Sequence, residues 1–304
     1  MDKQQTTKSY ATFGLSRSMR QLSYAWQSRA KAEQNMTGLL QLVHRDEQRM
    51  EKCYGRPLEK MRILEIGPGQ GMERARYFGV KNTVIGLDLD VIPQGLDVGK
   101  YLQMIRENGF GRFAKTVGRK LILGPANSKA WEKAVGVKNM RYPAFLHGDI
   151  CQSIPEANAF DMVMSWSVFE HLPDPKAGLK NVIATLKPGG IFFISLHLFT
   201  SNNGHHDIRA FTGREDELPL WAHLRPSTKD QIEPSSYLNE WRLAQWRELF
   251  TELAPGHAEY LESYDYPERY GAKLTGALLQ ELSQYTKQEL LTVDMVYAWK
   301  KPLV

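Results

Sequence analysis

The sequence predicts an α/β fold with a mostly parallel sheet. Short apolar runs of the length of buried strands alternate with segments whose apolar residues recur at helical spacing. A glycine-rich turn, Gly67–Gly71, lies between the first apolar run and the helical segment after it. With 304 residues, 42% of them hydrophobic and 24% charged, the chain can bury a full core. One enlarged α/β domain accounts for these observations.

Seven apolar runs are the predicted strands. They are residues 61–66, 83–87, 144–146, 160–165, 191–198, 258–264 and 290–299. The helices predicted between them are residues 72–78, 99–108, 128–135, 177–186, 239–250 and 272–285. Strands that alternate with helices form parallel sheets, because each helix carries the chain back to the starting edge. The segment Lys187–Gly190 predicts a turn that launches the fifth strand.

Three segments lie outside this alternation. Residues 17–53 contain no proline and predict one or two helices, so we divide the chain into an N-terminal helical segment, residues 1–55, and a main domain, residues 56–304. Within the main domain, residues 91–143 and 200–250 are predicted insertions. The second insertion is expected to be lid-like, because its long first part is polar and rich in turn-forming residues.

The composition limits the compartment and the partners. The net charge is +5, and the densest basic stretch, Arg112–Lys120, predicts a solvated helix face, with a patch for an anionic substrate or membrane surface as the alternative. We expect no nucleic-acid partner. Cys53 and Cys151 lack metal-ligand spacing, and the most apolar run, Ile191–Phe199, is too short to span a bilayer. The expectation is a cytoplasmic protein without a transmembrane segment, and the oligomeric state stays open.

The glycine-rich turn indicates a cofactor site. Gly67, Gly69 and Gly71 occupy every second position, directly after a strand and before a helix. Glycine permits a positive φ and lets a ligand approach the backbone closely. A dinucleotide site would favour the spacing G-x-G-x-x-G, so a nicotinamide-dependent oxidoreductase is disfavoured. Glu65, just before the turn, suggests a cationic group nearby.

An acidic residue ends the second predicted strand. An acid about 20 residues beyond such glycines can accept hydrogen bonds from both ribose hydroxyls of a nucleoside. Asp88 occupies this position, and Asp90 competes for the role from slightly farther along the chain. We favour Asp88 because it lies closer to the end of the strand.

Residues 61–198 resemble the class I S-adenosyl-L-methionine-dependent methyltransferases. The resemblance rests on five motifs in order, LEIGPGQG, VIGLD, HGDI, FDMVMSWSVFEHL and LKPGG. It implies a Rossmann-like, mostly parallel seven-stranded sheet with helices on both faces, and S-adenosyl-L-methionine as cofactor with S-adenosyl-L-homocysteine as product. The long interval between the second and third motifs is unusual for the family and implies an insertion.

The resemblance also implies which residues bind the cofactor. In the family, the glycine turn holds the methionine part, the acid after the second strand holds the ribose, and the third motif flanks the adenine. By matching position, the implied residues are Glu65, Gly67, Pro68, Gly69, Gly71, Asp88, Leu89, Asp149, Ile150, Ser165 and Trp166.

Histidines gather where the methyl acceptor should bind. Ligands of open α/β sheets bind beyond the carboxyl ends of the strands, and four of the eight histidines follow the fourth and fifth predicted strands. We predict His206 as the general base for a hydroxyl acceptor, with Asp207 to orient it. His171 is the competing catalytic residue, or it caps a turn. His197 and His205 rank lower.

A metal ion is the alternative use of these side chains. The histidines and Asp207 after the fifth strand could supply nitrogen and oxygen ligands. The pair Glu170-His171 is similar to the metal-binding pair of ubiquinone-pathway O-methyltransferases, but that pattern has a further acid where this chain has Ser167. We therefore predict no metal site, and Mg2+ is the ion to test because it prefers oxygen ligands.

The leading functional hypothesis is O-methylation of a hydroxyl on a glycan or secondary metabolite. N- or C-methylation of a small molecule and a non-catalytic methyltransferase-fold partner protein are the alternatives. The segment Ser165–Val168 differs from the [N/D]PP[Y/F/W] motif of many N-methyltransferases that act on protein or nucleic acid. Trp221, Tyr237, Trp241 and Trp246 could form an aromatic platform for a sugar ring or another amphipathic acceptor. For Trp241 and Trp246 the alternative is a place in the core.

Overall fold

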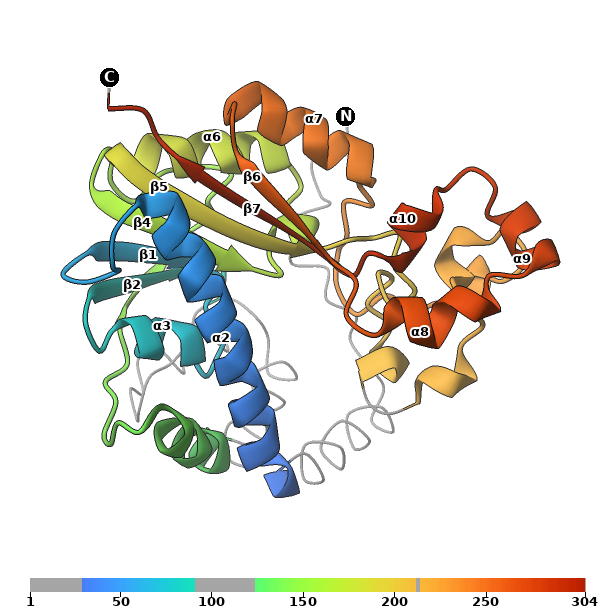
Figure 1. Ribbon diagram of the computed structural model, residues 1–304, viewed down its shortest axis with the longest axis horizontal. Helices are drawn as coiled ribbons and strands as arrows, with labels where there is room; N and C mark the ends of the chain where they lie inside the picture. The colour runs from blue at the N-terminus through green and yellow to red at the C-terminus, as the bar shows by residue number, and fades with distance from the viewer. Residues whose placement is uncertain (1–28, 91–123, 212–213, 304) are drawn as a thin grey trace. The chain divides into compact units, whose positions relative to one another are not determined.

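The computed structural model describes residues 29–90, 124–211 and 214–303 (Figure 1). The helix predicted at residues 99–108 and the basic stretch Arg112–Lys120 lie outside the described residues. So does most of the insertion predicted at residues 91–143.

Seven strands of the described residues form one sheet, in the order β3-β2-β1-β4-β5-β7-β6 (Figure 1). They are β1 (Arg62–Ile66), β2 (Thr83–Asp88), β3 (Ala144–His147), β4 (Phe160–Trp166), β5 (Leu186–His197), β6 (Ala258–Glu262) and β7 (Asp294–Lys300). Strand β1 pairs in parallel with β2 and β4, β2 pairs in parallel with β3, and β6 is antiparallel to β7. The predicted Rossmann-like, mostly parallel seven-stranded α/β fold is therefore confirmed.

Helices connect these strands. They are α2 (Ala32–Tyr54), α3 (Glu73–Phe78), a helix at residues 124–135, α6 (Pro175–Thr185), α7 (Leu243–Leu253), α8 (Tyr266–Tyr270), α9 (Gly276–Glu281) and α10 (Lys287–Leu291). The single helix predicted at residues 272–285 was wrong, because that stretch is divided between the 3-10 helix η6 (Gly271–Lys273) and α9. The described residues contain no helix long and apolar enough to cross a membrane.

The helix α2 precedes the first strand, within the predicted N-terminal helical segment. Its buried face carries Met36, Val43, Met50 and Tyr54, at the spacing of an amphipathic helix. The helix ends at Gly55, whose φ of 87° closes it and whose N–H donates to the Glu51 carbonyl. The division of the chain after residue 55 stays a prediction.

The described residues form two compact units, which we treat separately. The glycine-loop unit contains residues up to 165 together with 181–192 and the last residues from 300 onward. The histidine unit contains residues 166–180 and 193–299.

The glycine-loop unit has its core on the parallel strands. Ile63 and Leu64 of β1 and Met162, Val163 and Met164 of β4 are fully buried. Such continuous apolar runs are typical of parallel strands that are covered on both faces. The core therefore fixes the strand ends that carry the cofactor motifs.

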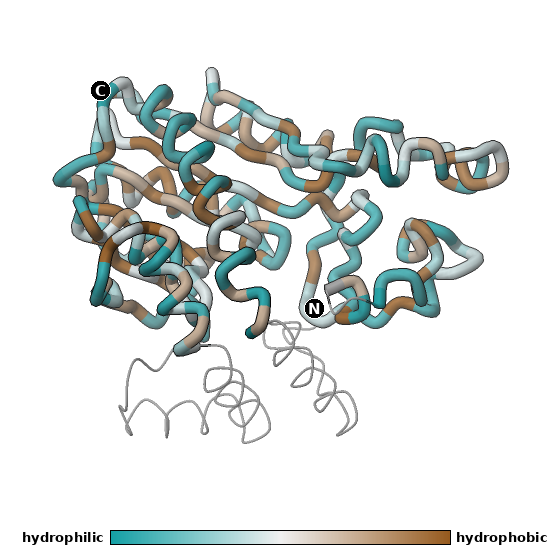
Figure 2. Tube along the Cα trace, turned by 60° about the horizontal axis from the view of Figure 1, so that its bottom comes forward, coloured by the Kyte–Doolittle hydropathy of each residue, from teal (hydrophilic) through white to brown (hydrophobic). Residues whose placement is uncertain are grey.

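Strand β5 begins earlier than the sequence predicted. The predicted turn Lys187–Gly190 belongs to the strand, because the N–H of Gly189 donates to the Lys301 carbonyl (3.0 Å) and the N–H of Lys301 donates to the Gly190 carbonyl (2.8 Å). Gly189 has a φ of 75°, which bends the chain without ending the strand. The apolar run that follows, Ile191–Ile194, is fully buried, and the hydropathy of the chain can be followed in Figure 2.

The insertion after β5 is more structured than an irregular loop. It contains four short 3-10 helices, η2 (Ile208–Phe211), η3 (Glu215–Glu217), η4 (Ala222–Leu224) and η5 (Lys229–Gln231). Trp221 is fully buried and packs in a cluster with Tyr270, at 5.8 Å between ring centroids, and with Leu290. The insertion therefore shares a core with the segment that contains α8, α9 and α10. Its lid-like character stays a prediction.

Candidate functional site

The parallel strands of the glycine-loop unit bring the cofactor motifs to one edge. Ile66, the last residue of β1, lies opposite Leu87 of β2 and Ser165 of β4. Asp88, the last residue of β2, lies opposite His147 of β3. The residues that follow these strand ends therefore surround one site at the carboxyl edge of the sheet.

The glycine loop needs glycine at defined positions. The N–H of Gly67 donates to the Leu87 carbonyl (2.8 Å), which ties the loop to the neighbouring strand. Gly67 and Gly69 both have a φ of 66°. A Cβ at Gly71 would lie 1.9 Å from a carboxylate oxygen of Glu73. That oxygen is the movable end of a side chain, so it is the positive φ of Gly67 and Gly69 that requires glycine in this loop.

Glu65 is a buried acid directly behind this loop. It is 3% exposed, and burial raises the pKa of its carboxyl to about 8, although Arg74 opposes the shift. Its Oε2 atom has no hydrogen-bond partner among the described residues. A buried, incompletely satisfied carboxyl is costly in a folded protein. A cationic ligand group would supply the missing partner.

Two further acids follow strand ends at the same edge. The Oδ1 atom of Asp88 accepts a hydrogen bond from the Asp90 backbone (2.9 Å), which fixes the rotamer of the side chain. The Oδ1 atom of Asp149 accepts one from the Cys151 backbone (2.8 Å). The carbonyl of Leu89 accepts a hydrogen bond from a ring nitrogen of His147, at 2.8 Å. The N–H of Gly148 donates to the Asp88 carbonyl (3.0 Å), which sets the segment that precedes Asp149 beside the end of β2.

The remaining predicted cofactor residues differ in exposure. Ile150 is 3% exposed, and Ser165 is fully buried with its hydroxyl donating to the Ile66 carbonyl (3.2 Å). Pro68 packs against Gly86, where a Cβ would come within 3.0 Å of its ring. Ser165 thus braces the glycine loop from behind.

Trp166 belongs to the histidine unit. Its ring lies 5.8 Å from that of Phe193 on β5, measured between centroids.

Three histidines of the histidine unit form one cluster, which we call the histidine cluster. The His206 ring lies 4.9 Å from the His171 ring and 5.1 Å from the His197 ring, each at 66° between planes. All three side chains are partly exposed. His206 has a φ of 49°, a conformation that non-glycine residues seldom adopt outside functional or tightly constrained positions. The cluster joins residues from the ends of β4 and β5 and from the insertion.

The tautomer of His171 follows from its hydrogen bond. Its Nδ1 atom lies 2.7 Å from the Tyr237 carbonyl, which can only accept, so Nδ1 donates and Nε2 carries the lone pair. Burial lowers the pKa of His171, and burial together with the neighbouring histidines lowers that of His206 well below its ordinary value. Both imidazoles are therefore neutral at neutral pH.

Glu170 lies beside the cluster. It is 2% exposed, its Oε1 atom accepts a hydrogen bond from the His197 backbone (3.2 Å), and burial raises its pKa to about 7. Its Oε2 atom has no hydrogen-bond partner among the described residues. One ligand atom from each of Glu170, His171 and His206 lies within 4.8 Å of the other two. Two of these donors are nitrogens, so the set does not suit Mg2+, which prefers oxygen.

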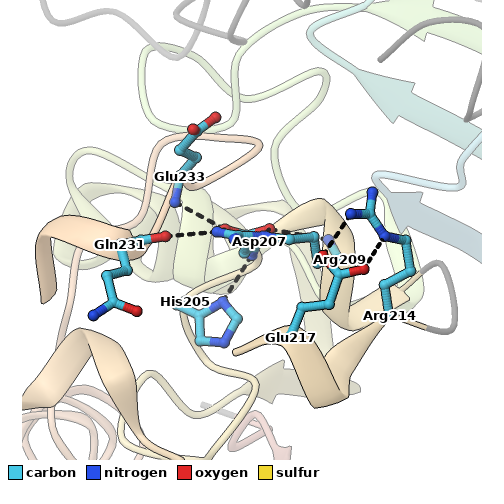
Figure 3. Close-up of polar contacts among 7 residues, drawn as sticks. All are labelled: His205, Asp207, Arg209, Arg214, Glu217, Gln231 and Glu233. Carbon is cyan, nitrogen blue, oxygen red and sulfur yellow. Dashed lines mark hydrogen bonds and ion pairs between the residues drawn. The ribbon is translucent and has the colours of Figure 1, made fainter. Parts of the chain in front are cut away.

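Asp207 connects two parts of the insertion, one around Arg209 and one around Glu233 (Figure 3). Its carboxylate accepts hydrogen bonds from Nε (3.0 Å) and Nη2 (2.6 Å) of Arg209 and from the backbone of Glu233 (2.8 Å). Arg209 in turn donates to the Gln231 carbonyl at 2.6 Å. The Asp207 N–H donates to Nδ1 of His205, a buried histidine whose pKa burial lowers to about 4. Both carboxylate oxygens of Asp207 are thus engaged in holding the segment that carries His206.

Sequence reasoning did not single out Asp294 at the start of β7. Its Oδ1 atom lies 3.2 Å from Nδ1 of His197, and its Oδ2 atom accepts a hydrogen bond from the Tyr264 hydroxyl at 2.8 Å. Nε2 of His197 lies 3.1 Å from the Ser201 hydroxyl. The signal in the sequence was a single acid inside the apolar run LLTVDMVYAW. An acid is seldom found in a buried strand, so its presence there indicates a partner or a function.

The tryptophans are mainly core residues. Trp221 is fully buried and Trp246 is 1% exposed. Trp241 is partly exposed and lies 4.9 Å from Trp246 between ring centroids. Of the three, Trp241 could contact a ligand.

Comparison with known proteins identifies the family. A family model described as a methyltransferase domain matches residues 31–251. The chain belongs to this methyltransferase family. This membership confirms the prediction that the chain is a class I S-adenosyl-L-methionine-dependent methyltransferase.

Individual relatives are distant. A ubiquinone biosynthesis O-methyltransferase from Coxiella burnetii is 33% identical over 93 residues, which is 24% of this chain and 39% of the relative. The chain thus spans well under half the length of the curated relatives it matches.

Solved structures with a similar fold share little sequence. Phosphoethanolamine N-methyltransferase 2 from Haemonchus contortus has a TM-score of 0.45 and 18% identity, over 84% of this chain and 52% of the other. The YcgJ protein from Bacillus subtilis has a TM-score of 0.43 and 18% identity, over 85% and 99%. Similarity this distant says nothing about the acceptor.

Proposed function

We propose that this methyltransferase transfers the methyl group of S-adenosyl-L-methionine to a hydroxyl group of a glycan or secondary metabolite. A histidine of the histidine cluster takes the hydroxyl proton. The gathering of His171, His197 and His206 after β4 and β5 is the observation that carries the proposal, because an alcohol must lose its proton during the reaction.

The glycine-loop unit supplies the cofactor site. When bound, S-adenosyl-L-methionine supplies a methyl group on a positively charged sulfur. Gly67, Gly69 and Gly71 line its methionine part, and the Oε2 atom of Glu65 gains the hydrogen-bond partner that it lacks among the described residues. Asp88 accepts hydrogen bonds from the ribose hydroxyls. The remaining residues that this unit contributes flank the adenine or brace the loop; they are Pro68, Leu89, Asp149, Ile150 and Ser165.

The reaction is an in-line displacement. The acceptor oxygen forms a bond to the methyl carbon while the carbon–sulfur bond breaks. The electron pair of that bond goes to sulfur, which becomes neutral in S-adenosyl-L-homocysteine. The hydroxyl proton passes to an imidazole nitrogen, for which His206 and His171 are the sequence-predicted candidates.

A hydroxyl acceptor agrees better with the site than a nitrogen acceptor does. An amine of ordinary basicity must lose a proton before it can attack, but it can lose that proton to water. A ubiquinone biosynthesis O-methyltransferase, which is 33% identical to this chain over 93 residues, methylates oxygen by its name and supports the same choice.

The proposal is tested by measuring S-adenosyl-L-homocysteine release against paired acceptors. Catechol, a nucleotide-linked hexose and a phenolic glycoside form the hydroxyl set, and aniline and ethanolamine form the nitrogen set. Release that depends on a hydroxyl compound, and that Asp88→Ala abolishes at low cofactor concentration, is the expected result. Release with the nitrogen set alone, or binding of the cofactor with no transfer to any class, would overturn the proposal.

A further inference from the structure

The start of β7 lies where three strand ends of the histidine unit meet. The N–H of Leu198, after β5, donates to the Val293 carbonyl at 2.8 Å. The N–H of Val293 donates to the Glu262 carbonyl at the end of β6, at 2.7 Å. The bond between Leu198 and Val293 sets His197 beside Asp294, because His197 precedes Leu198 in the chain and Asp294 follows Val293.

Asp294 uses both carboxylate oxygens at this junction. Oδ1 pairs with His197, and Oδ2 accepts the hydroxyl hydrogen of Tyr264. The side chains of His197 and Asp294 are 14% and 21% exposed, and Tyr264 is 45% exposed. The carboxylate is thus held from two sides at a place that solvent and ligand can reach.

The pairing fixes the tautomer of His197. A carboxylate oxygen accepts, so in this pairing Nδ1 of His197 carries the hydrogen and Nε2 carries the lone pair. The Ser201 hydroxyl then donates to Nε2 across 3.1 Å. A carboxylate on Nδ1 orients an imidazole and stabilises the imidazolium that forms when Nε2 takes a proton.

The other two histidines of the cluster have different surroundings. His171 donates Nδ1–H to a neutral carbonyl, and burial lowers its pKa. For His206, burial and the neighbouring imidazoles lower the pKa. The geometric difference is that Nδ1 of His197 lies against a carboxylate, whereas Nδ1 of His171 lies against a carbonyl. The groups that face His197 are Asp294, Ser201, the His206 ring and Glu170.

Tyr264 contributes a second feature at the same junction. Its φ of 48° is uncommon for an aromatic residue, and its ring is left exposed while its hydroxyl is bound. Exposed, well-held aromatic rings are typical contacts for ring-shaped ligands.

We infer that Asp294 positions His197 as the general base and Tyr264 as the contact for an acceptor that carries its hydroxyl on a ring. This inference rests on the proposed O-methylation. The acceptor hydroxyl replaces Ser201 as the donor to Nε2, and its proton moves to Nε2 as the new carbon–oxygen bond forms. Asp294 stays ionised and pairs with the imidazolium, which later releases the proton to water.

The tautomer can be measured without any acceptor. Long-range ¹H–¹⁵N spectra of the full-length apoprotein at neutral pH distinguish the two nitrogens of each histidine, and His197→Gln identifies the resonance. We expect Nδ1–H for His197, and a shift towards Nε2–H in Asp294→Leu. His257, whose Nδ1 bonds the Ala254 carbonyl, is the internal control and should not change. Nε2–H or imidazolium in the wild type would overturn the inference.

Activity variants separate positioning from structure. Asp294→Asn keeps the size and polarity of the side chain but removes its charge, and should lower kcat by ~10-fold or more with KM for the cofactor unchanged. His197→Asn should lose on the order of 10² in kcat. Tyr264→Leu should raise KM for a ring acceptor. Tyr264→Phe, which keeps the ring, should have a KM near that of the wild type.

These outcomes distinguish the inference from the proposed function. If no hydroxyl compound accepts a methyl group, the proposed function fails whatever the tautomer. If transfer occurs and His206→Ala is crippled while His197→Asn and Asp294→Asn are near normal, the inference fails and the proposed function stands. If Asp294→Leu does not fold, the tautomer of His197 is measured in Asp294→Asn instead.

Discussion

The cofactor edge and the histidine cluster both lie at strand ends, but they differ in how the chain builds them. At the cofactor edge, Glu65 and Asp88 lie at the ends of the consecutive strands β1 and β2, which pair residue by residue, and the glycine loop follows β1. The histidine cluster and its partner Asp294 come from four separate segments, held by single backbone bonds and by the insertion. The first site is therefore readable as a motif, and the second needs the fold.

The largest expected effect comes from Gly204→Ala, which should damage the histidine unit alone. A Cβ there would lie 2.0 Å from the Phe199 carbonyl oxygen and 2.6 Å from that of Leu198, both backbone atoms. The turn between His197 and the insertion must open, so we expect a turnover loss on the order of 10²-fold and a stability loss of about 1–3 kcal/mol.

Calorimetry with S-adenosyl-L-homocysteine should show near-wild-type affinity for Gly204→Ala. The matched control is Gly271→Ala, where nothing lies within 4 Å of the added Cβ. Equal loss of cofactor affinity in Gly204→Ala would contradict the separation of the two regions.

The converse change is Asp88→Ala, which should damage cofactor binding alone. A charge-assisted hydrogen bond contributes roughly 1.5–3 kcal/mol, so affinity should fall at least about tenfold. The histidine tautomers in the apoprotein should be unchanged, because Asp88 belongs to the glycine-loop unit. Unchanged affinity by calorimetry would move the ribose contact to Asp90.

Asp207→Asn sharpens the comparison within the histidine unit. The substitution removes the charge that Arg209 binds, so the free energy of unfolding should fall by roughly 1.5–3 kcal/mol. Any loss of turnover should be indirect, because the substitution loosens the segment that holds His206. A normal melting curve combined with a loss of turnover on the order of 10² would instead support the predicted catalytic role of Asp207.

The difference between the regions explains what the sequence could predict. Local periodicity placed most of the strands, although residues 290–291 of the last predicted strand belong to α10. The family was identified from five motifs in order. Asp88, His171 and His206 were singled out by their positions at or after strand ends, and their roles stay predictions. The pairing of Asp294 with His197 depends on β7 lying beside β5, which no short pattern encodes. The cluster around Trp221 was not predicted because it joins the insertion to residues 266–293, which lie far along the chain.

Glu65 gives a smaller, pH-dependent test at the cofactor edge. Its folded pKa of about 8 lies above the ordinary 4.5, so the folded state keeps a proton that the unfolded state releases. The contribution of this group to stability is therefore full below pH 4.5 and declines as the pH rises towards 8. Thermal melts of the apoprotein should show this decline, and Glu65→Gln should flatten it. An identical profile in the variant would contradict the assigned burial.

Chelation should have the smallest effect of all. If the histidine cluster handles a proton, EDTA leaves turnover unchanged. Loss of turnover that Mn2+ or Zn2+ restores would make Glu170, His171 and His206 metal ligands, since their ligand atoms lie within 4.8 Å of one another.

The most direct measurement follows the methyl group itself. S-adenosyl-L-methionine labelled with ¹³C in its methyl group is incubated with the wild-type enzyme and the hydroxyl acceptors, and the product is examined by carbon NMR. The account predicts a methoxy carbon resonance, which His197→Asn greatly slows and Asp88→Ala removes at low cofactor concentration. A label that appears on nitrogen or carbon, or that stays on sulfur with every acceptor, would contradict O-methylation.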